Sequence, residues 1–295
     1  MPRLSSDRRQ SVDLLRIVAA FGIVWAHMDA PYPAEGYVAL ALFVILTAFL
    51  SFRSASTRAP GRFLRGRAWR VLVPWLIWCA IYLVVEALRL RDLSRLWTLT
   101  DPRWLLIGPV IHLWFLPFVL VSAPLVVAAE RGLRGARAVW AAAVLAAPIG
   151  VAAIWLHDHD ALAPPFVQWA FAAMPMLYGL LSAAAQGRGG WPAPLVFALL
   201  ATMPPALLWH SFLAPHLLAA ALVFEALWRA PIRHPWLPSL GALAFGIYLV
   251  HPFFMLVWFH FTGGLPLWLG AMAVFVMSAL AAAAMRALPI RLRAR

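Results

Sequence analysis

Arg16 and His27 are two residues of the first apolar segment that could take part in chemistry. A guanidinium can hold an anion, and an imidazole can accept a proton near neutral pH. At about 100° and 1.5 Å per residue, a helix would place them on one face, ~16 Å apart. Asp13 falls on the same face, three residues before Arg16, at a spacing that suits an ion pair. Ionisable residues inside membrane spans usually mark functional sites, so this stripe is the first candidate site.

A second candidate is a series of arginines that leads into the third apolar segment. It contains Arg62, Arg65, Arg67 and Arg70. Arg67 and Arg70 share a helix face, and their planar guanidinium groups match phosphate oxygens in geometry. A helix N-terminus would add backbone N–H donors for the same anion. Taken alone, the series is equally consistent with arginines that only set membrane topology.

Three further histidine-containing stretches invite a functional interpretation. His112 and Trp114 lie in the fourth apolar segment, and Tyr248 and His251 in the ninth. An intramembrane histidine often only hydrogen-bonds a neighbouring helix. Under the topology derived below, however, His27, His112 and His251 all fall in the extracytoplasmic half. The residues 157–160, His-Asp-His-Asp, are interpreted as a polar connector, and no metal site is expected.

Composition decides which kind of fold must position these residues. Of the 295 residues, 64% are hydrophobic and 12% charged, whereas soluble domains carry about 25% charged residues. Ten apolar runs approach the ~20 residues that a helix needs to cross a bilayer. We therefore expect an all-α integral membrane protein, a bundle of about ten transmembrane helices. The predicted spans cover residues 12–29, 36–53, 70–89, 106–129, 138–156, 166–185, 192–210, 212–229, 237–259 and 265–285.

The distribution of arginine predicts the orientation. If the N-terminus is cytoplasmic, 19 of the 24 basic residues fall on the cytoplasmic side, and only Arg89, Arg91, Arg95 and Arg103 fall outside. This asymmetry predicts that both termini are cytoplasmic. The net charge of +13 then reflects topology and an affinity for anionic membrane lipids, and nucleic-acid binding is not expected. We expect residues 1–295 to form a single transmembrane domain without an appended soluble domain.

The chain resembles the membrane acyltransferase 3 family. The similar stretches occur in order along the sequence: Val12-Asp13-Leu14-Leu15-Arg16-Ile17 through His27, residues 42–50, Phe63-Leu64-Arg65 through Arg67, Arg70 and Pro74, His112-Leu113-Trp114-Phe115-Leu116, and Tyr248-Leu249-Val250-His251. Thr47-Ala48-Phe49 stands where the family usually has a Ser-Gly-Phe step. Each stretch is weak alone, but together they are fairly specific and cover nearly the whole chain.

The resemblance implies a multi-pass O-acyltransferase of the bacterial inner membrane. It implies transfer of an acyl group, usually acetyl, from cytoplasmic acyl-coenzyme A to a hydroxyl of a carbohydrate or lipid-linked glycan outside. Arg16 and His27, with Asp13 beside them, would be the catalytic group. The coenzyme phosphates would bind Arg67 and Arg70, with Arg65 in the same series. The binding site for the acceptor would be formed by His112, Trp114, Tyr248 and His251.

Several alternatives stay open at this stage. His27 could act as a general base or carry the acyl group covalently, and Arg16 could hold the coenzyme arm or stabilise an oxyanion. A secondary transporter or exporter would also place Arg and His inside its spans, although no convincing internal repeat is found. A non-catalytic membrane scaffold is the third class.

Overall fold

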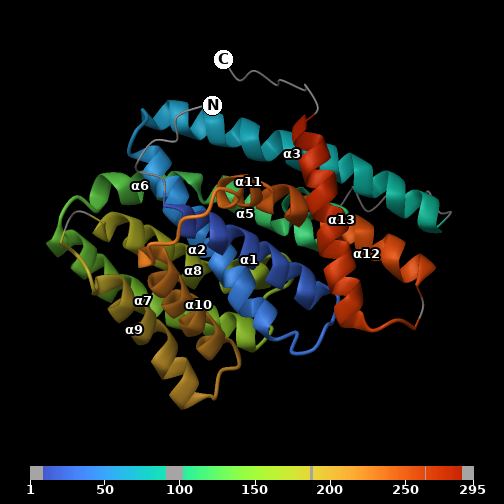
Figure 1. The fold of residues 1–295 in the computed structure, drawn as a ribbon. Helices are drawn as coiled ribbons and strands as arrows, with labels where there is room; N and C mark the ends of the chain where they lie inside the picture. Colours follow the sequence, from blue (N-terminus) through green and yellow to red (C-terminus); the bar gives the residue numbers. More distant parts are fainter. Residues whose placement is uncertain (1–8, 91–101, 187–188, 263, 288–295) are drawn as a thin grey trace. The chain divides into compact units, whose positions relative to one another are not determined.

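The computed structural model describes residues 9–90, 102–186, 189–262 and 264–287, and every regular element in these ranges is a helix (Figure 1). The expected all-α class is therefore confirmed for this part of the chain. Of the arginines used to predict topology, eight lie outside the described residues: Arg3, Arg8, Arg91, Arg95, Arg188, Arg291, Arg293 and Arg295.

Within the described ranges, seven helical segments are long and apolar enough to cross a membrane. These candidate spans are Glu35–Ala55, Pro60–Arg89, Ile111–Gly132, Ala136–Asp158, Phe166–Ala185, Ala244–Phe261 and Leu267–Ala287. Helix α9 (Ala193–Leu208) is apolar but shorter. Helices α1 (Gln10–His27) and α10 (Leu213–Arg229) coincide with two further predicted segments. The chain is thus a multi-pass membrane protein, while the count of ten spans and the cytoplasmic termini stay predictions.

Two predicted spans are not single helices. Residues 106–129 fall on α4 (Trp104–Ile107), the 3-10 helix η2 (Ile111–Trp114), α5 (Phe115–Val121) and α6 (Ala123–Gly132). The first break occurs at Gly108-Pro109, where Gly108 has a φ of 81°, a left-handed conformation that glycine adopts without a steric penalty. Residues 237–259 divide into α11 (Leu237–Gly241) and α12 (Ala244–Phe261).

The chain divides into two compact units. The first contains the described residues up to Leu46 and from Pro215 onward, and the second contains Thr47–Ala214. Helices α2 (Glu35–Ala55) and α10 contribute residues to both units. The expectation of one membrane domain over residues 1–295 stays a prediction.

In the first unit, α1 packs against α11, α12 and α13 (Leu267–Ala287), and α12 runs beside α13 (Figure 1). Val24 and Met28 of α1 share a buried apolar cluster with Ile247 of α12 and Val274 of α13. Small residues bring α1 close to α2, because a Cβ at Gly22 would lie only 2.5 Å from the Cβ of Ala39. Close packing of this kind is typical of small residues in membrane helices.

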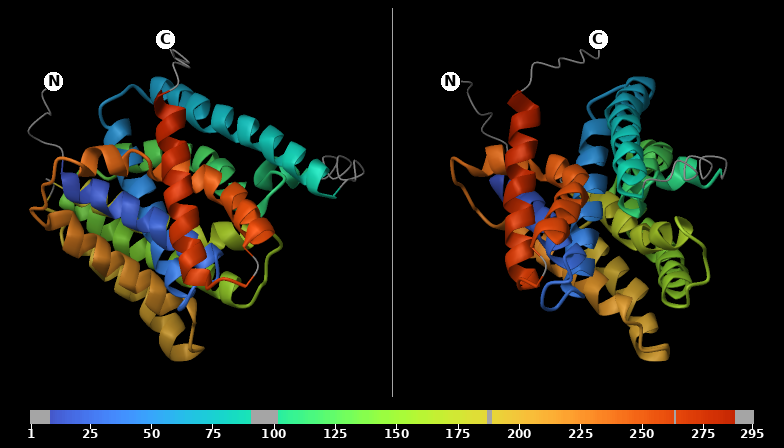
Figure 2. Two further views of the ribbon diagram at one scale, coloured as in Figure 1. Left: turned by 45° about the vertical axis from the view of Figure 1, so that its right-hand side comes forward. Right: turned by 90° about the vertical axis from the view of Figure 1, so that its right-hand side faces the viewer.

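In the second unit, α7 (Ala136–Asp158) packs against both α8 (Phe166–Ala185) and α9 (Figure 2). A Cβ at Gly150 of α7 would lie 2.7 Å from the Cβ of Ala201 in α9, so these two backbones also approach closely. Helix α3 (Pro60–Leu90) packs against α5 and α6. Its first turns hold the arginine series, and its apolar remainder supplies a candidate span.

The predicted orientation can be tested with topology reporters. We expect fusions at residues 60 and 295 to report a cytoplasmic location and a fusion at residue 159 an extracytoplasmic one, because arginine accumulates on the cytoplasmic side. Paired alkaline phosphatase and fluorescent protein fusions at each position measure this. An extracytoplasmic signal at residue 295 would contradict the prediction that the chain crosses the membrane an even number of times from a cytoplasmic N-terminus.

Candidate functional site

The Asp13–Arg16 pair forms within the first turns of α1. Arg16 Nη1 lies 3.7 Å from Asp13 Oδ1, and the exposed fractions of the two side chains are 29% and 4%, respectively. Asp13 is enclosed because the backbone of α11 comes very near it: a Cβ at Gly241 would lie 2.6 Å from the Cβ of Asp13. The guanidinium therefore extends toward the N-terminal end of α1, the direction in which helical side chains normally lean.

His27 is the last residue of α1 and its ring is held by the helix itself. Its Nδ1 lies 2.8 Å from the carbonyl oxygen of Ile23. A carbonyl oxygen only accepts, so Nδ1 must carry the proton of a neutral ring. Nε2 then keeps a free lone pair. Nε2 is therefore the atom of His27 that can accept a proton.

His251 of α12 is the neighbour of His27 in the first unit. The two ring centroids are 5.1 Å apart, with an interplanar angle of 44°. His251 is fully buried, and its Nδ1 lies 2.8 Å from the carbonyl oxygen of Tyr248. Tyr248 in turn stacks on Phe43 of α2, with centroids 5.4 Å apart. Residues from three helices thus determine where the buried imidazole lies, and this imidazole packs against that of His27.

Arg67 of α3 is held in place by α2. Its guanidinium donates a hydrogen bond to the hydroxyl of Ser51, which itself donates to the carbonyl of Thr47 one turn earlier in α2. The guanidinium carbon also lies 5.5 Å from the centroid of the Phe63 ring, within the range of a cation–π contact. The side chain therefore loses little further freedom when it binds an anion.

Positive charge accumulates around Arg67. Arg58 and Arg70 act on it electrostatically, and the Arg70 guanidinium folds back over Gly66, where a Cβ would lie 3.6 Å from Nη2. Arg65 is exposed and two residues away from Arg67, hence on another side of the helix. In the described part of the chain, no ion pair neutralises Arg58, Arg67 or Arg70. Such a cluster is suited to an anionic ligand.

His112 and Trp114 are buried in the second unit. The ring of His112 meets Tyr82 of α3 edge-on, with centroids 5.1 Å apart. Trp114 packs edge-on against Phe115 and Phe118. Both residues belong to the short η2 helix, and their neighbours are aromatic.

A family model described as an acyltransferase domain, that of acyltransferase 3, matches residues 9–287. The chain belongs to the acyltransferase 3 family. No curated protein and no solved structure gives a significant match. The suspected family is thereby confirmed over nearly the whole chain, and the protein is a membrane acyltransferase.

The candidate residues of this acyltransferase 3 protein fall into two sets, one in each unit. The first unit holds the Asp13–Arg16 pair and the group formed by His27, Tyr248 and His251. The second unit holds the remaining candidates: Arg65, Arg67, Arg70, His112 and Trp114. Their assignment as catalytic, donor-binding or acceptor-binding residues stays a prediction.

Sequence reasoning missed Ser51 and the contribution of Arg58 to the arginine cluster. Ser51 follows Thr47 by one helical turn, so both share a face of α2. This spacing can be recognised in the sequence. Nothing in the sequence, however, indicated which helix that face would meet. Arg58 precedes the start of α3, so helix periodicity gives no reason to expect it near Arg67.

Proposed function

We propose that this protein transfers an acyl group, most simply acetyl, from cytoplasmic acyl-coenzyme A to a hydroxyl of an extracytoplasmic carbohydrate or lipid-linked glycan. Its location would be the bacterial inner membrane. The observation that carries the proposal is the ring of His27, which is fixed at Nδ1 by the carbonyl oxygen of Ile23 and packed against buried His251. This arrangement leaves Nε2 unprotonated, and an O-acyl transfer needs such a base.

His27 would act as the general base. Its Nε2 takes the proton of the acceptor hydroxyl while the hydroxyl oxygen forms a bond to the thioester carbon. The carbon–sulfur bond then breaks, and the imidazolium returns its proton to the departing coenzyme thiolate. The protein ends the cycle with neutral His27, so no further reagent is consumed. His251 would hold the ring of His27 in its productive orientation from the buried side.

Arg16 would bind the acyl-coenzyme A donor rather than stabilise the oxyanion that forms during acyl transfer. An oxyanion donor must lie about 3 Å from the charged oxygen, whereas Arg16 and His27 are separated by ~16 Å along α1. Its guanidinium also extends toward Asp13, away from His27. A molecule that meets both residues must be elongated, as the pantetheine arm of the coenzyme is.

The arginine cluster would bind the other end of the donor. Coenzyme A carries a nucleoside diphosphate and a further phosphate, and planar guanidinium groups recognise phosphate oxygens through paired hydrogen bonds. Arg67 is already oriented by Ser51 and Phe63, and Arg58 and Arg70 add charge. No metal is assigned a role, and membrane lipids are the surrounding partner.

The proposal is tested with the purified full-length protein in lipid nanodiscs. Radiolabelled acetyl-coenzyme A is supplied together with a lipid-linked glycan extract, and acylated glycan is measured by chromatography and mass spectrometry. We expect thioester consumption that requires the acceptor and is matched by O-acetyl product. Movement of glycan across liposomes without thioester consumption would instead indicate a transporter. Unchanged surface glycans in a deletion strain, together with no transfer in vitro, would favour a scaffold.

Substitution of Arg16 by Lys distinguishes a donor contact from a counter-ion for Asp13. Lys keeps the charge that pairs with Asp13 but lacks the planar guanidinium with its paired N–H donors. We expect the variant to fold with a normal elution profile and to raise the KM for acyl-coenzyme A about tenfold, as expected for the loss of one charge-assisted hydrogen bond. Wild-type kinetics in Arg16→Lys would reduce Arg16 to a structural partner of Asp13.

A further inference from the structure

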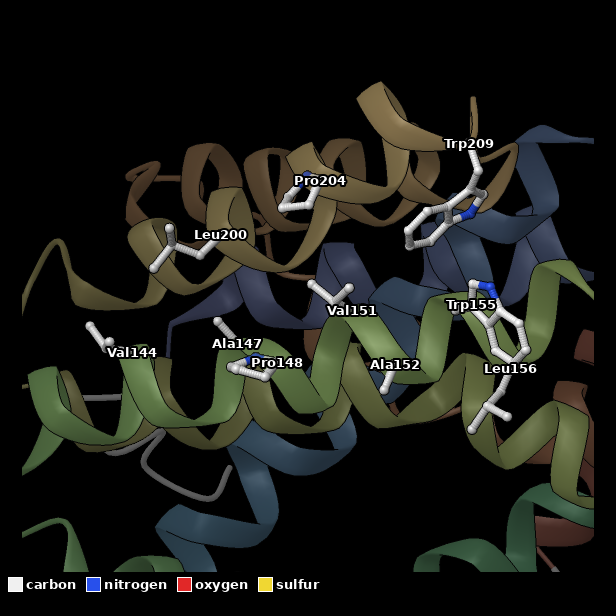
Figure 3. Close-up of a pocket in the computed structure, with 10 residues that line it drawn as sticks. All are labelled: Val144, Ala147, Pro148, Val151, Ala152, Trp155, Leu156, Leu200, Pro204 and Trp209. Carbon is white, nitrogen blue, oxygen red and sulfur yellow. The ribbon is translucent and has the colours of Figure 1, made fainter.

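An apolar groove of about 770 Å3 runs between α7 and α9 in the second unit (Figure 3). Its walls are made by aliphatic side chains and two prolines of both helices: Val144, Ala147, Pro148, Val151, Leu200 and Pro204. The close contact of Gly150 with Ala201 joins the two helices. None of the residues discussed above as donor or acceptor sites lines this groove.

The length of the groove matches one leaflet of a bilayer. Its lining on α7 extends from Val144 to Leu156, which corresponds to ~18 Å of helix. One leaflet contributes about half of the ~30 Å hydrocarbon core. Because α7 is a candidate membrane span and Val144, Leu200 and Trp155 are exposed, a hydrocarbon chain can enter from the side.

One end of the groove differs chemically from the rest. Figure 3 shows Trp155 and Trp209 together at the end opposite Val144. The indole nitrogen of Trp209 donates a hydrogen bond of 3.0 Å to Asp158 Oδ2, and His159 stacks on Trp155 with centroids 4.6 Å apart. Tryptophans commonly mark the boundary between hydrocarbon and headgroups. The polar end therefore corresponds to the position of a lipid headgroup.

Asp158 supplies the carboxylate at this end, and its Oδ1 also lies 3.7 Å from Nδ1 of His157. Between residues 138 and 186, Asp158 and Asp160 are the only Asp, Glu, Lys or Arg residues, and none occurs between 189 and 224. These two segments offer no guanidinium to a headgroup whose only charge is that of its phosphate. An ammonium group, by contrast, is attracted by a carboxylate and by the faces of tryptophan rings. A metal is a poorer fit, since no group of three potential ligands occurs among the described residues.

We propose that the α7–α9 groove binds a zwitterionic phospholipid, with one acyl chain between the helices and its ammonium group at the Trp155–Asp158–Trp209 end. The groove is thus a specific lipid site rather than general bilayer contact. It does not depend on the proposed acyl-transfer chemistry, because its occupant is a membrane lipid and not the donor or the acceptor.

Native mass spectrometry of the detergent-purified full chain tests this site. The probe is an equimolar mixture of phosphatidylethanolamine and phosphatidylglycerol with identical acyl chains. We expect the ethanolamine lipid to be retained at least about threefold more, in line with the strength of a cation–π contact. Val151→Trp, which fills the groove, should reduce retention of that lipid to the level of phosphatidylglycerol. The matched control is Leu145→Trp, because Leu145 is an exposed α7 residue outside the groove.

Asp158→Asn tests the headgroup end separately. Asn keeps a side-chain oxygen for the Trp209 indole but removes the charge, so the protein should remain folded and lose its preference for the ethanolamine lipid. Equal retention of both lipids by the wild type would overturn the proposal. So would unchanged retention in Val151→Trp, or a dimer that Val151→Trp dissociates, which would identify a second copy as the occupant.

Discussion

His27→Ala is expected to abolish acyl transfer while changing the affinity for acyl-coenzyme A by no more than a few-fold. The proposed role of His27 is to take a proton from the acceptor, and positioned base catalysis contributes about 10²–10⁴-fold. The donor phosphates are assigned to arginines of α3 and not to His27. Product formation in nanodiscs measures the first effect, and calorimetric titration with a non-hydrolysable coenzyme analogue measures the second.

His27→Gln is the control that separates chemistry from positioning. Glutamine can form hydrogen bonds but cannot accept a proton at neutral pH, so it should be nearly as inactive as Ala. If His27→Gln retained full turnover, His27 would be a positioning residue only. A covalent acyl–His27 intermediate would be revealed by radiolabel that stays on the wild-type protein after a pulse of donor without acceptor.

The double substitution Arg67→Gln and Arg70→Gln is expected to weaken donor binding about ten- to hundredfold at fixed salt. A desolvated charge-assisted hydrogen bond is worth about 1.5–3 kcal/mol. Arg67 is partly buried, so its share should be the larger; Arg70 is exposed, and solvent screening reduces its contribution. Calorimetric titration gives the affinity, and turnover at saturating donor should recover most of the wild-type rate.

Arg65→Gln is the matched control for this measurement. It removes the same charge from the same helix, but from an exposed position on another side. Ser51→Ala leaves all arginines in place and removes only the hydroxyl that orients Arg67, so it should weaken binding less than Arg67→Gln does. If the double variant bound donor as tightly as Arg65→Gln, topology would be the sole role of the series.

The sequence by itself determined the helices and several local pairs. Apolar length and charge distribution are local properties, so each of the ten predicted segments coincides with a helix or a group of helices. The ion pair of Asp13 with Arg16 depends only on spacing within one helix, and it is present. The division of residues 106–129 could have been anticipated at Gly108-Pro109, because proline disfavours helix at the residue before it.

Only the tertiary structure decided which distant residues meet. His27 and His251 are on different helices, and no periodicity indicates that their rings lie 5.1 Å apart. The same holds for Ser51 with Arg67, and for the α7–α9 groove, which needs two helices to exist. The hydrophobic pattern specifies that a helix is apolar, but almost every face of a membrane helix is apolar. The choice of neighbours therefore rests on small residues such as Gly22, Gly150 and Gly241, whose missing side chains let particular backbones approach.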